Sequence, residues 1–167
     1  MLMRWCTIIL IMGLIVGLDQ LTKLWVEQSL PLYSVIPVTS FFNLVHFRNT
    51  GAAFGFLSDP NTQWQLWFFL GTTLIALGAI FFLARSARKE GYFYFTGLGL
   101  IGGGAIGNAI DRIRLQEVID FLDFHAFGYH WPAFNVADIA ICCGVAILLY
   151  FIVFPQHHAE SDTTATP

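Results

Sequence analysis

The chain has 167 residues, of which 56% are hydrophobic and 11% are charged, and its mean hydropathy is +0.66. Soluble proteins carry about 25% charged residues, so this composition excludes an ordinary soluble domain and indicates a membrane protein. The formal net charge of -3 gives no electrostatic reason to expect a nucleic-acid partner. Cys6, Cys142 and Cys143 lie in apolar stretches without a CxxC pair, so we expect them to be buried as small hydrophobic residues.

Four segments are long and apolar enough to cross a bilayer. They cover about residues 5–26, 64–84, 91–110 and 136–154, each close to the roughly 20 residues that a hydrocarbon core requires. A cleaved signal peptide is the alternative for the first segment, but that segment lacks a small-x-small cleavage site and runs on into polar residues. The sequence therefore predicts an all-α membrane protein with four transmembrane helices.

Basic residues near the segment ends predict the orientation. Arg4 precedes the first span, and three basic residues connect the second span to the third: Arg85, Arg88 and Lys89. Because cytoplasmic loops are enriched in Lys and Arg, we expect both chain termini in the cytoplasm, and residues 27–63 and 111–135 outside it.

The first outer loop is predicted to form a small extracytoplasmic sheet on the membrane face. Residues 35–38 and 41–48 are β-branched or aromatic runs, the turn 49–51 follows, and residues 52–57 continue apolar. Residues 58–60 are expected to cap the second span. We expect one integral-membrane domain over residues 1–155, and a polar, disordered tail over 156–167.

The third span is rich in small residues. Gly99, Gly103 and Gly107 are spaced by four and share one helix face, which permits close approach of a neighbouring helix. Gly97, Gly99 and Gly102 also match G-x-G-x-x-G, but a dinucleotide site needs a preceding strand and a βαβ unit, which this segment lacks.

Two pairs of polar residues stand four apart on predicted helices. Asp19 and Lys23 can form an ion pair that supports a site, or a simple pair near the outer interface with Lys23 extending toward water. Asn108 and Arg112 can hold a substrate carbonyl or head group, or they are the hydrated end of a span. Arg112 and Arg114 lie on the predicted outer side against the charge bias, which makes them candidates for a role other than topology.

Asp120 and Asp138 each lie at the edge of an apolar segment, where an ionisable group usually marks a site. If a helix begins near Pro132, Asn135 and Asp138 face the same way. The intervening loop can bring the two carboxylates together, so that they share one proton and hydrolyse an amide. The alternative is a helix-capping Asp and an unrelated loop Asp, with Asp111 and Asp123 as competing carboxylates.

Other chemistries fit the sequence less well. A metal site of Asp120, Asp123, His125 and His130 has no HExxH motif, and its spacing matches no familiar ligand set. A serine or cysteine nucleophile lacks the Gly-x-Ser-x-Gly motif, and the cysteines lie in spans.

Five blocks of this sequence resemble lipoprotein signal peptidase, the signal peptidase II family of bacterial membranes. They occur in the family's order over about residues 5–155, at 19–23, 48–54, 103–112, 118–121 and 131–138. The resemblance implies an aspartic endopeptidase that cleaves prolipoproteins just before a diacylglyceryl-modified cysteine, with Asp120 and Asp138 as its catalytic dyad. It implies no metal or organic cofactor.

The resemblance also implies the roles of further residues. Positions that contact substrate or shape the site are Asn49, Asn108, Arg112 and Asn135. Supporting positions are Asp19, Lys23, Gly51, Gly103, Gly107, Asp111, Phe134 and Ala137. The first outer loop is similar to the family's sheet-like cradle, and the segment between Asp120 and Asp138 to its mobile lid. The implied setting is the bacterial cytoplasmic (inner) membrane, with the site at the outer face, lipid around the spans and a monomer as the working form.

Two other classes of function remain open at this point. A small proton or ion conductor also places Asp, Lys and Arg in a membrane, although the charged residues here gather on one side. A membrane scaffold without enzymatic activity is supported only by the glycine face.

Overall fold

The structure is a computed structural model that describes residues 2–51, 64–87 and 90–154. Its elements in chain order are α1 (Leu2–Ser29), β1 (Val35–Thr39), β2 (Phe42–Asn49), α2 (Trp64–Ser86), α3 (Tyr92–Leu115), β3 (Val118–Ala126), β4 (Tyr129–His130) and α4 (Val136–Val153). The expectations for residues 52–60, for Arg88 and Lys89, and for the tail 156–167 lie outside the described residues.

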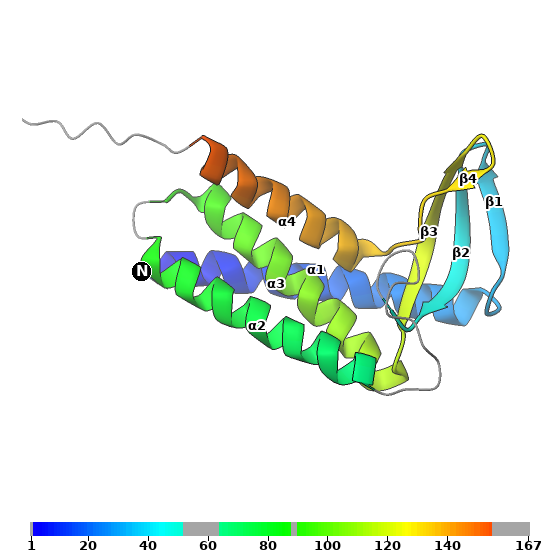
Figure 1. Ribbon diagram of the computed structural model, residues 1–167, viewed down its shortest axis with the longest axis horizontal. Helices are drawn as coiled ribbons and strands as arrows, with labels where there is room; N and C mark the ends of the chain where they lie inside the picture. Colours follow the sequence, from blue (N-terminus) through cyan, green and yellow to red (C-terminus); the bar gives the residue numbers. More distant parts are fainter. Residues whose placement is uncertain (1, 52–63, 88–89, 155–167) are drawn as a thin grey trace, which may run out of the picture.

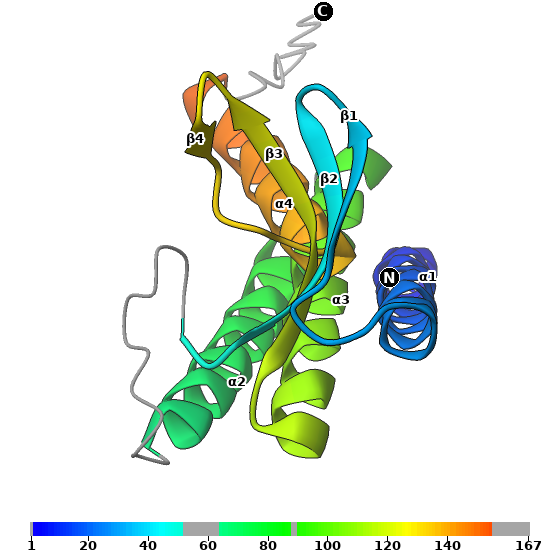
Figure 2. The same cartoon turned by 90° about the vertical axis from the view of Figure 1, so that its right-hand side faces the viewer.

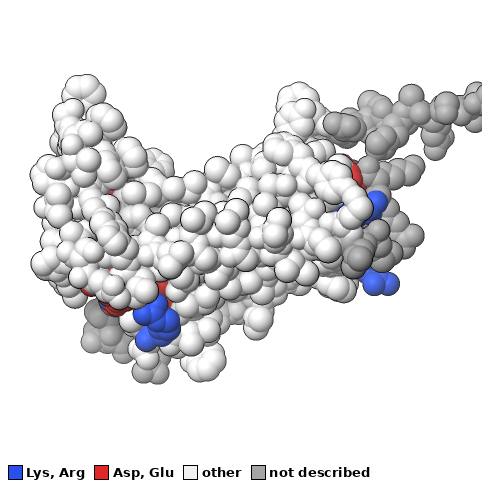
Figure 3. All heavy atoms as spheres, turned by 180° about the vertical axis from the view of Figure 1, so that it is seen from behind, with Lys and Arg blue, Asp and Glu red and all other residues white. Residues whose placement is uncertain are grey.

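Four helices among the described residues are long and apolar enough to cross a membrane, and they fall on the four predicted segments. They run side by side, and the sheet lies at one end of the bundle while α1 begins at the other (Figure 1). On the face shown in Figure 3, charged side chains gather at these two ends and the middle carries none. This is the charge distribution of a multi-pass membrane protein.

Helix α3 extends further than predicted. It continues to Leu115, so Asp111, Arg112 and Arg114 are helical and not part of an outer loop that starts at residue 111. The helix ends where Gln116 adopts the left-handed conformation (φ 62°) and its N–H bonds to the carbonyl of Arg112. That reversal directs the chain back as β3, which carries Asp120.

The glycines of α3 let two neighbouring helices approach closely. A Cβ on Gly99 would lie 2.8 Å from the Cβ of Ile11 in α1, and one on Gly103 would lie 2.8 Å from that of Ile15. Gly104 belongs to a second face, where a Cβ would collide with the backbone carbonyl of Ala137 in α4. The predicted packing face is confirmed, and the face toward α4 was missed.

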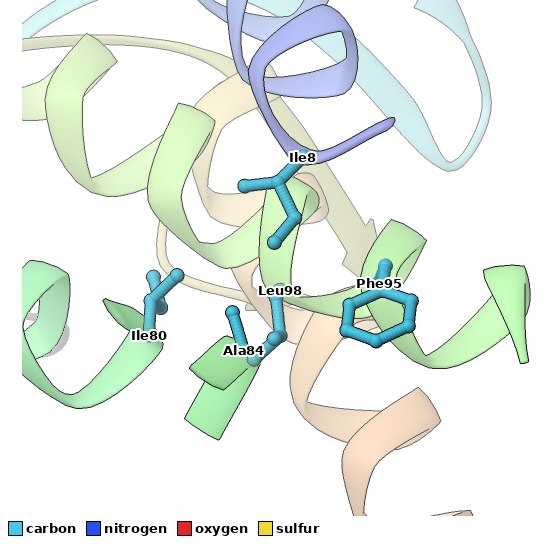
Figure 4. Close-up of a cluster of buried hydrophobic side chains, with 5 residues drawn as sticks. All are labelled: Ile8, Ile80, Ala84, Phe95 and Leu98. Carbon is cyan, nitrogen blue, oxygen red and sulfur yellow. The ribbon is translucent and has the colours of Figure 1, made fainter. Parts of the chain in front are cut away.

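An apolar cluster joins three helices at the end of the bundle away from the sheet. Its buried members are Ile8, Ile80, Ala84, Phe95 and Leu98 (Figure 4). They come from α1, α2 and α3, so hydrophobic packing holds these three helices together at this end.

The four strands form one antiparallel sheet in the order β1-β2-β3-β4 (Figure 2). β1 and β2 match the predicted strands. β3 and β4 lie in the segment expected as an outer loop. This expectation was wrong for β3, which pairs with β2 from Phe42↔Phe124 to Asn49↔Val118. The residues of β3 alternate too little to reveal a strand, because Val118, Ile119, Asp120 and Phe121 are all buried.

The prediction for the cysteines was wrong. Cys6, Cys142 and Cys143 are all exposed on helix surfaces. A spanning helix faces lipid, and a small thiol needs no burial there.

Candidate active site

Asp138 stands at the start of α4, in a position fixed by the helix cap. Asn135 is the N-cap; its side-chain oxygen accepts the N–H of Asp138 at 3.0 Å, and Asp138 Oδ2 accepts the N–H of Asn135 at 3.2 Å. This reciprocal capping box fixes the carboxylate at the helix N-terminus. The helix begins at Val136, not near Pro132, so Asp138 both caps the helix and faces the site.

The segment before α4 is tied directly to β3. The carbonyl of Phe134 accepts the N–H groups of Phe121 at 3.1 Å and Leu122 at 2.9 Å, and its own N–H donates to Leu122. The rings of Phe134 and Phe124 stack with centroids 5.8 Å apart. These contacts hold the elements that carry the two aspartates against each other.

Asp120 is buried on β3 between two asparagine amides. Asn135 Nδ2 donates to its Oδ1 at 2.8 Å, and Asn49 Nδ2 donates to its Oδ2 at 3.0 Å. The N–H of Gly51 bonds to Asn49 Oδ1 at 2.9 Å, which orients the Asn49 amide so that its NH₂ faces the carboxylate. The predicted supporting residue Gly51 therefore acts on Asn49.

The surroundings of Asp120 raise its pKa from 3.8 to about 7. Burial is the main cause and the negative charge of Asp138 is the second, while the hydrogen bonds from Asn49 and Asn135 oppose them. A carboxylic acid that stays protonated near neutral pH beside a second carboxylate is suited to proton transfer.

Both aspartates line one cavity of about 740 Å³. Its polar residues include Asn49, Asn108 and Arg112. Most of its surface is apolar and comes from three of the spanning helices, with Phe69 and Ala76 of α2, Ile101 and Ala105 of α3, and Ile139 and Cys142 of α4. The cavity thus joins a polar end at the dyad to an apolar region at membrane depth, which suits an amphiphilic ligand.

Beside the cavity lies a buried cluster of charges. Lys23 Nζ is 2.8 Å from Asp19 Oδ2 and 2.9 Å from Asp111 Oδ2, and all three side chains are fully buried. Asp19 also accepts the N–H of Ala137 at 2.9 Å, and Asp111 accepts that of Ile119 at 3.2 Å. The alternative of Lys23 extending to water is therefore wrong.

Arg112 faces the cavity and is held from three sides. Its guanidinium lies 4.0 Å from the ring centroid of Phe69, and it donates to the carbonyls of Gly51 at 3.2 Å and Asn108 at 3.5 Å. Its buried Nε has no hydrogen-bond partner among the described residues. Arg114 points elsewhere and forms a 3.4 Å ion pair with Glu27.

Asp123, the other competing carboxylate, belongs to a different environment. It accepts Asn43 Nδ2 at 2.7 Å and lies 2.9 Å from His130 Nδ1. Burial acts to raise the pKa of Asp123, but these hydrogen bonds and the nearby imidazoles hold it below its usual value. Over the described part of the chain, no group of three or more His, Cys, Asp or Glu side chains is arranged to hold a metal ion.

Two site residues were missed by the sequence reasoning. Gln20 donates to Asp19, Asp111 and the carbonyl of Gly107, at 3.0 to 3.2 Å. Its place between Asp19 and Lys23 in a conspicuous polar run was an available signal. Phe69 supports Arg112, and an apolar residue in a span carries no such signal.

Fold and site together define a class, namely a multi-pass membrane protein with two carboxylates in an amphiphilic cavity at one end of its bundle. A sequence model of the family described as Signal peptidase (SPase) II matches residues 11–154. A lipoprotein signal peptidase of Oleidesulfovibrio alaskensis is 54% identical over 144 residues, which cover 84% of this chain and 90% of the relative. A lipoprotein signal peptidase of Geobacter metallireducens is 46% identical over 146 residues, which cover 87% of this chain and 89% of the relative.

Two solved structures described as bacterial membrane enzymes are also similar. Their TM-scores are 0.76 and 0.75 at 34% and 33% identity; the likeness covers 88% and 90% of this chain, and 87% and 94% of theirs. The chain belongs to the signal peptidase II family and is a protease. The alternative of a proton or ion conductor is not supported.

Proposed function

We propose that the protein removes the signal peptide from diacylglyceryl-modified prolipoproteins by hydrolysing the amide bond before the lipidated cysteine, with Asp120 and Asp138 as its catalytic dyad. The observation that carries this proposal is the cavity that both carboxylates line. Asn108, Asn135 and Asn49 hold them there with amide donors. The names of the relatives support the substrate class.

In this reaction the dyad begins with one proton. The ionised aspartate takes a proton from water as the water oxygen bonds to the scissile carbonyl carbon, and the protonated aspartate gives its proton to the carbonyl oxygen. When the C–N bond breaks, the first aspartate protonates the departing cysteine amine. A hydroxyl proton of the intermediate returns to the second aspartate. The products are a carboxylic acid and a free amine, and the dyad again holds one proton.

The shape of the cavity supports the substrate class. Apolar side chains of α2, α3 and α4 form the walls that would contact acyl chains. Arg112 has an Nε without a hydrogen-bond partner among the described residues, and a peptide carbonyl beside the dyad would satisfy it. Asn49, Asn108 and Asn135 orient the dyad as well as the substrate.

The orientation in the membrane follows from the charges at the two ends of the bundle. Arg4 belongs to the start of α1 and Arg85 to the last turn of α2. Both helix ends lie at the end of the bundle away from the sheet (Figure 1), where basic residues are expected if that end is cytoplasmic. At the sheet end, Lys23, Arg48 and Arg114 each pair with a carboxylate. We therefore place the sheet and the dyad at the outer face of the bacterial inner membrane, and both termini in the cytoplasm. A single domain of residues 1–155, surrounded by lipid, works as a monomer because one chain supplies both aspartates.

The experiment is a cleavage assay on one lipidated and one unlipidated precursor of the same sequence, with the products analysed by mass spectrometry. We expect cleavage just before the cysteine and only in the lipidated precursor. Equal rates on both precursors, or cleavage at another bond, would overturn the proposed substrate.

A further inference from the structure

Lys23 uses its third hydrogen-bond donor on a neutral group. Two of its N–H groups face the carboxyl groups of Asp19 at 2.8 Å and Asp111 at 2.9 Å. The third donates to Asn108 Oδ1 at 2.9 Å. Lys23 is fully buried, so this contact is part of the interior beside the dyad and not an accident of the surface.

That contact determines which way the Asn108 amide points. An ammonium group has donors and no acceptor, so the Asn108 atom that faces it must be the oxygen. Asn135 Nδ2 points at the same oxygen from 3.2 Å. The NH₂ group of Asn108 therefore faces away and donates to Asp138 Oδ1 at 2.8 Å. A continuous chain of hydrogen bonds runs from Lys23 through Asn108 to Asp138.

The two aspartates then have unequal surroundings. Asp138 lies in the first turn of α4, where the helix N-terminus favours a negative charge. It is also less buried than Asp120, and it accepts an amide whose oxygen is bonded to an ammonium. Asp120 lies on β3, outside the first turn of α4, with an exposed fraction of 4%. Burial disfavours the charged form of a carboxyl group.

We propose that Lys23 is a positioning residue for catalysis: through Asn108 it keeps Asp138 as the ionised aspartate that accepts the proton of water, and leaves Asp120 as the proton donor. This inference rests on the proposed function and assigns the two roles within it. The pKa of about 7 for Asp120 agrees with the assignment.

Among the described residues, the charged groups around Asp138 come from β3, α3 and α1. Asp120 faces it from β3 and Arg112 from α3, and both line the same cavity. Lys23 of α1 reaches it through Asn108, with Asp19 and Asp111 as the other partners of the ammonium. The part of α2 that lines the cavity contributes Phe69, Thr72, Thr73 and Ala76, none of them charged.

The test is the pH profile of kcat/KM for Lys23→Met, a variant whose unbranched side chain is one heavy atom shorter and has no donors. Without the ammonium, the Asn108 amide can rotate and present its oxygen to Asp138, which favours the protonated form. We expect kcat to fall about 10- to 100-fold, the effect of one lost hydrogen bond to a charged group. KM should stay within about twofold, and the acid limb should move to a pH about one unit higher.

Glu27→Gln is the matched control, because it changes a residue one turn further along α1 whose partners are Arg48 and Arg114. Its profile should equal that of the wild type. An unshifted acid limb in folded Lys23→Met would overturn the role of Lys23. Lys23→Met should lose thermal stability whether or not Lys23 positions Asp138, so a lower melting temperature does not test the proposal.

A second variant decides the case if Lys23→Met does not fold. Asn108→Asp keeps an oxygen for Lys23 but removes the N–H that faces Asp138, so the same loss of kcat and the same shift of the acid limb are expected. A wild-type profile in Asn108→Asp would overturn the inference. Failure of the wild type to cleave a lipidated precursor would instead refute the proposed function, so the two failures are distinguishable.

Discussion

Two groups of buried carboxylates lie side by side in this protein, and they differ in their partners. Asp19 and Asp111 share the ammonium of Lys23 and cap backbone N–H groups of other elements. Asp120 and Asp138 accept hydrogen bonds from neutral amide and backbone donors of the described residues, and both face a cavity. A carboxylate fixed by a buried cation stabilises the fold, whereas one held by amides beside a second acid can exchange a proton. The comparison predicts that changes in the first group lower stability, with activity affected only through the contact of Lys23 with Asn108, and that changes in the second group act directly on catalysis.

The largest effect is expected from the dyad. Asp120→Asn and Asp138→Asn should each lower kcat by about 10³-fold or more, because a positioned acid or base contributes about 10²- to 10⁴-fold and the two act as a unit. Each amide keeps the size of the acid but turns one of its two acceptor oxygens into an NH₂ that faces an N–H donor, so the melting temperature in detergent should fall, and kcat is compared on folded protein. Asp123→Asn, on the same strand as Asp120, is the control and should retain activity. Undiminished cleavage by either dyad variant would refute the assigned roles.

The next largest effect is on stability and comes from Lys23. Lys23→Met leaves Asp19 and Asp111 buried without their cation, and breaking a buried ion pair costs about 3–5 kcal/mol. Reversible unfolding in mixed micelles measures this loss. Glu27→Gln breaks a partly exposed pair and should cost about 1 kcal/mol or less. Equal losses of unfolding free energy in Lys23→Met and Glu27→Gln would show that burial of the ion pairs of Lys23 with Asp19 and Asp111 adds nothing to stability.

The helix packing that supports both groups gives a smaller effect. Gly103→Leu should destabilise the protein by about 1–3 kcal/mol, because a side chain at this position meets Ile15 and the backbone of Met12. Gly78→Leu on α2 has nothing within 4 Å of its added Cβ and serves as the control. The melting temperatures of the two variants are compared in the same detergent. An unchanged melting temperature for Gly103→Leu would refute close packing between α1 and α3.

The smallest effect is the pH dependence of stability caused by Asp120. Its pKa is about 7 in the folded protein and 3.8 ordinarily, so between these values the folded state holds a proton that the unfolded chain releases. The resulting stabilisation is complete below pH 3.8 and is lost as the pH rises through about 7. The unfolding free energy of the wild type, relative to that of Asp120→Asn, should therefore decrease as the pH rises from 3.8 to about 7. A difference that grows more favourable to the wild type with rising pH would contradict the raised pKa.

The sequence predicted the parts of the structure that depend on local pattern. The four spans follow from length and hydropathy, the Asp19–Lys23 pair from a spacing of four, and the glycine face from the same periodicity. β1 and β2 follow from β-branched and aromatic runs.

The remaining features depend on contacts between distant segments, which spacing does not reveal. β3 is a strand because β2 lies beside it, and it is buried on both faces near Asp120, so no alternation marks it. Asp111 is a buried ion-pair partner because α1 brings Lys23 to it from 88 positions away in the sequence. The cysteines are exposed because a membrane protein turns apolar residues outward, which reverses the rule for soluble proteins.

The most direct measurement is the count of protonated aspartates in the resting enzyme. Isotope-edited infrared difference spectroscopy, with ¹³C-labelled aspartate and at a pH between 3.8 and about 7, detects a protonated carboxyl group by its C=O stretch. We predict a protonated band in the wild type that Asp120→Asn removes and Asp123→Asn leaves unchanged. A spectrum that keeps the same protonated band after Asp120→Asn would contradict a proton held on Asp120.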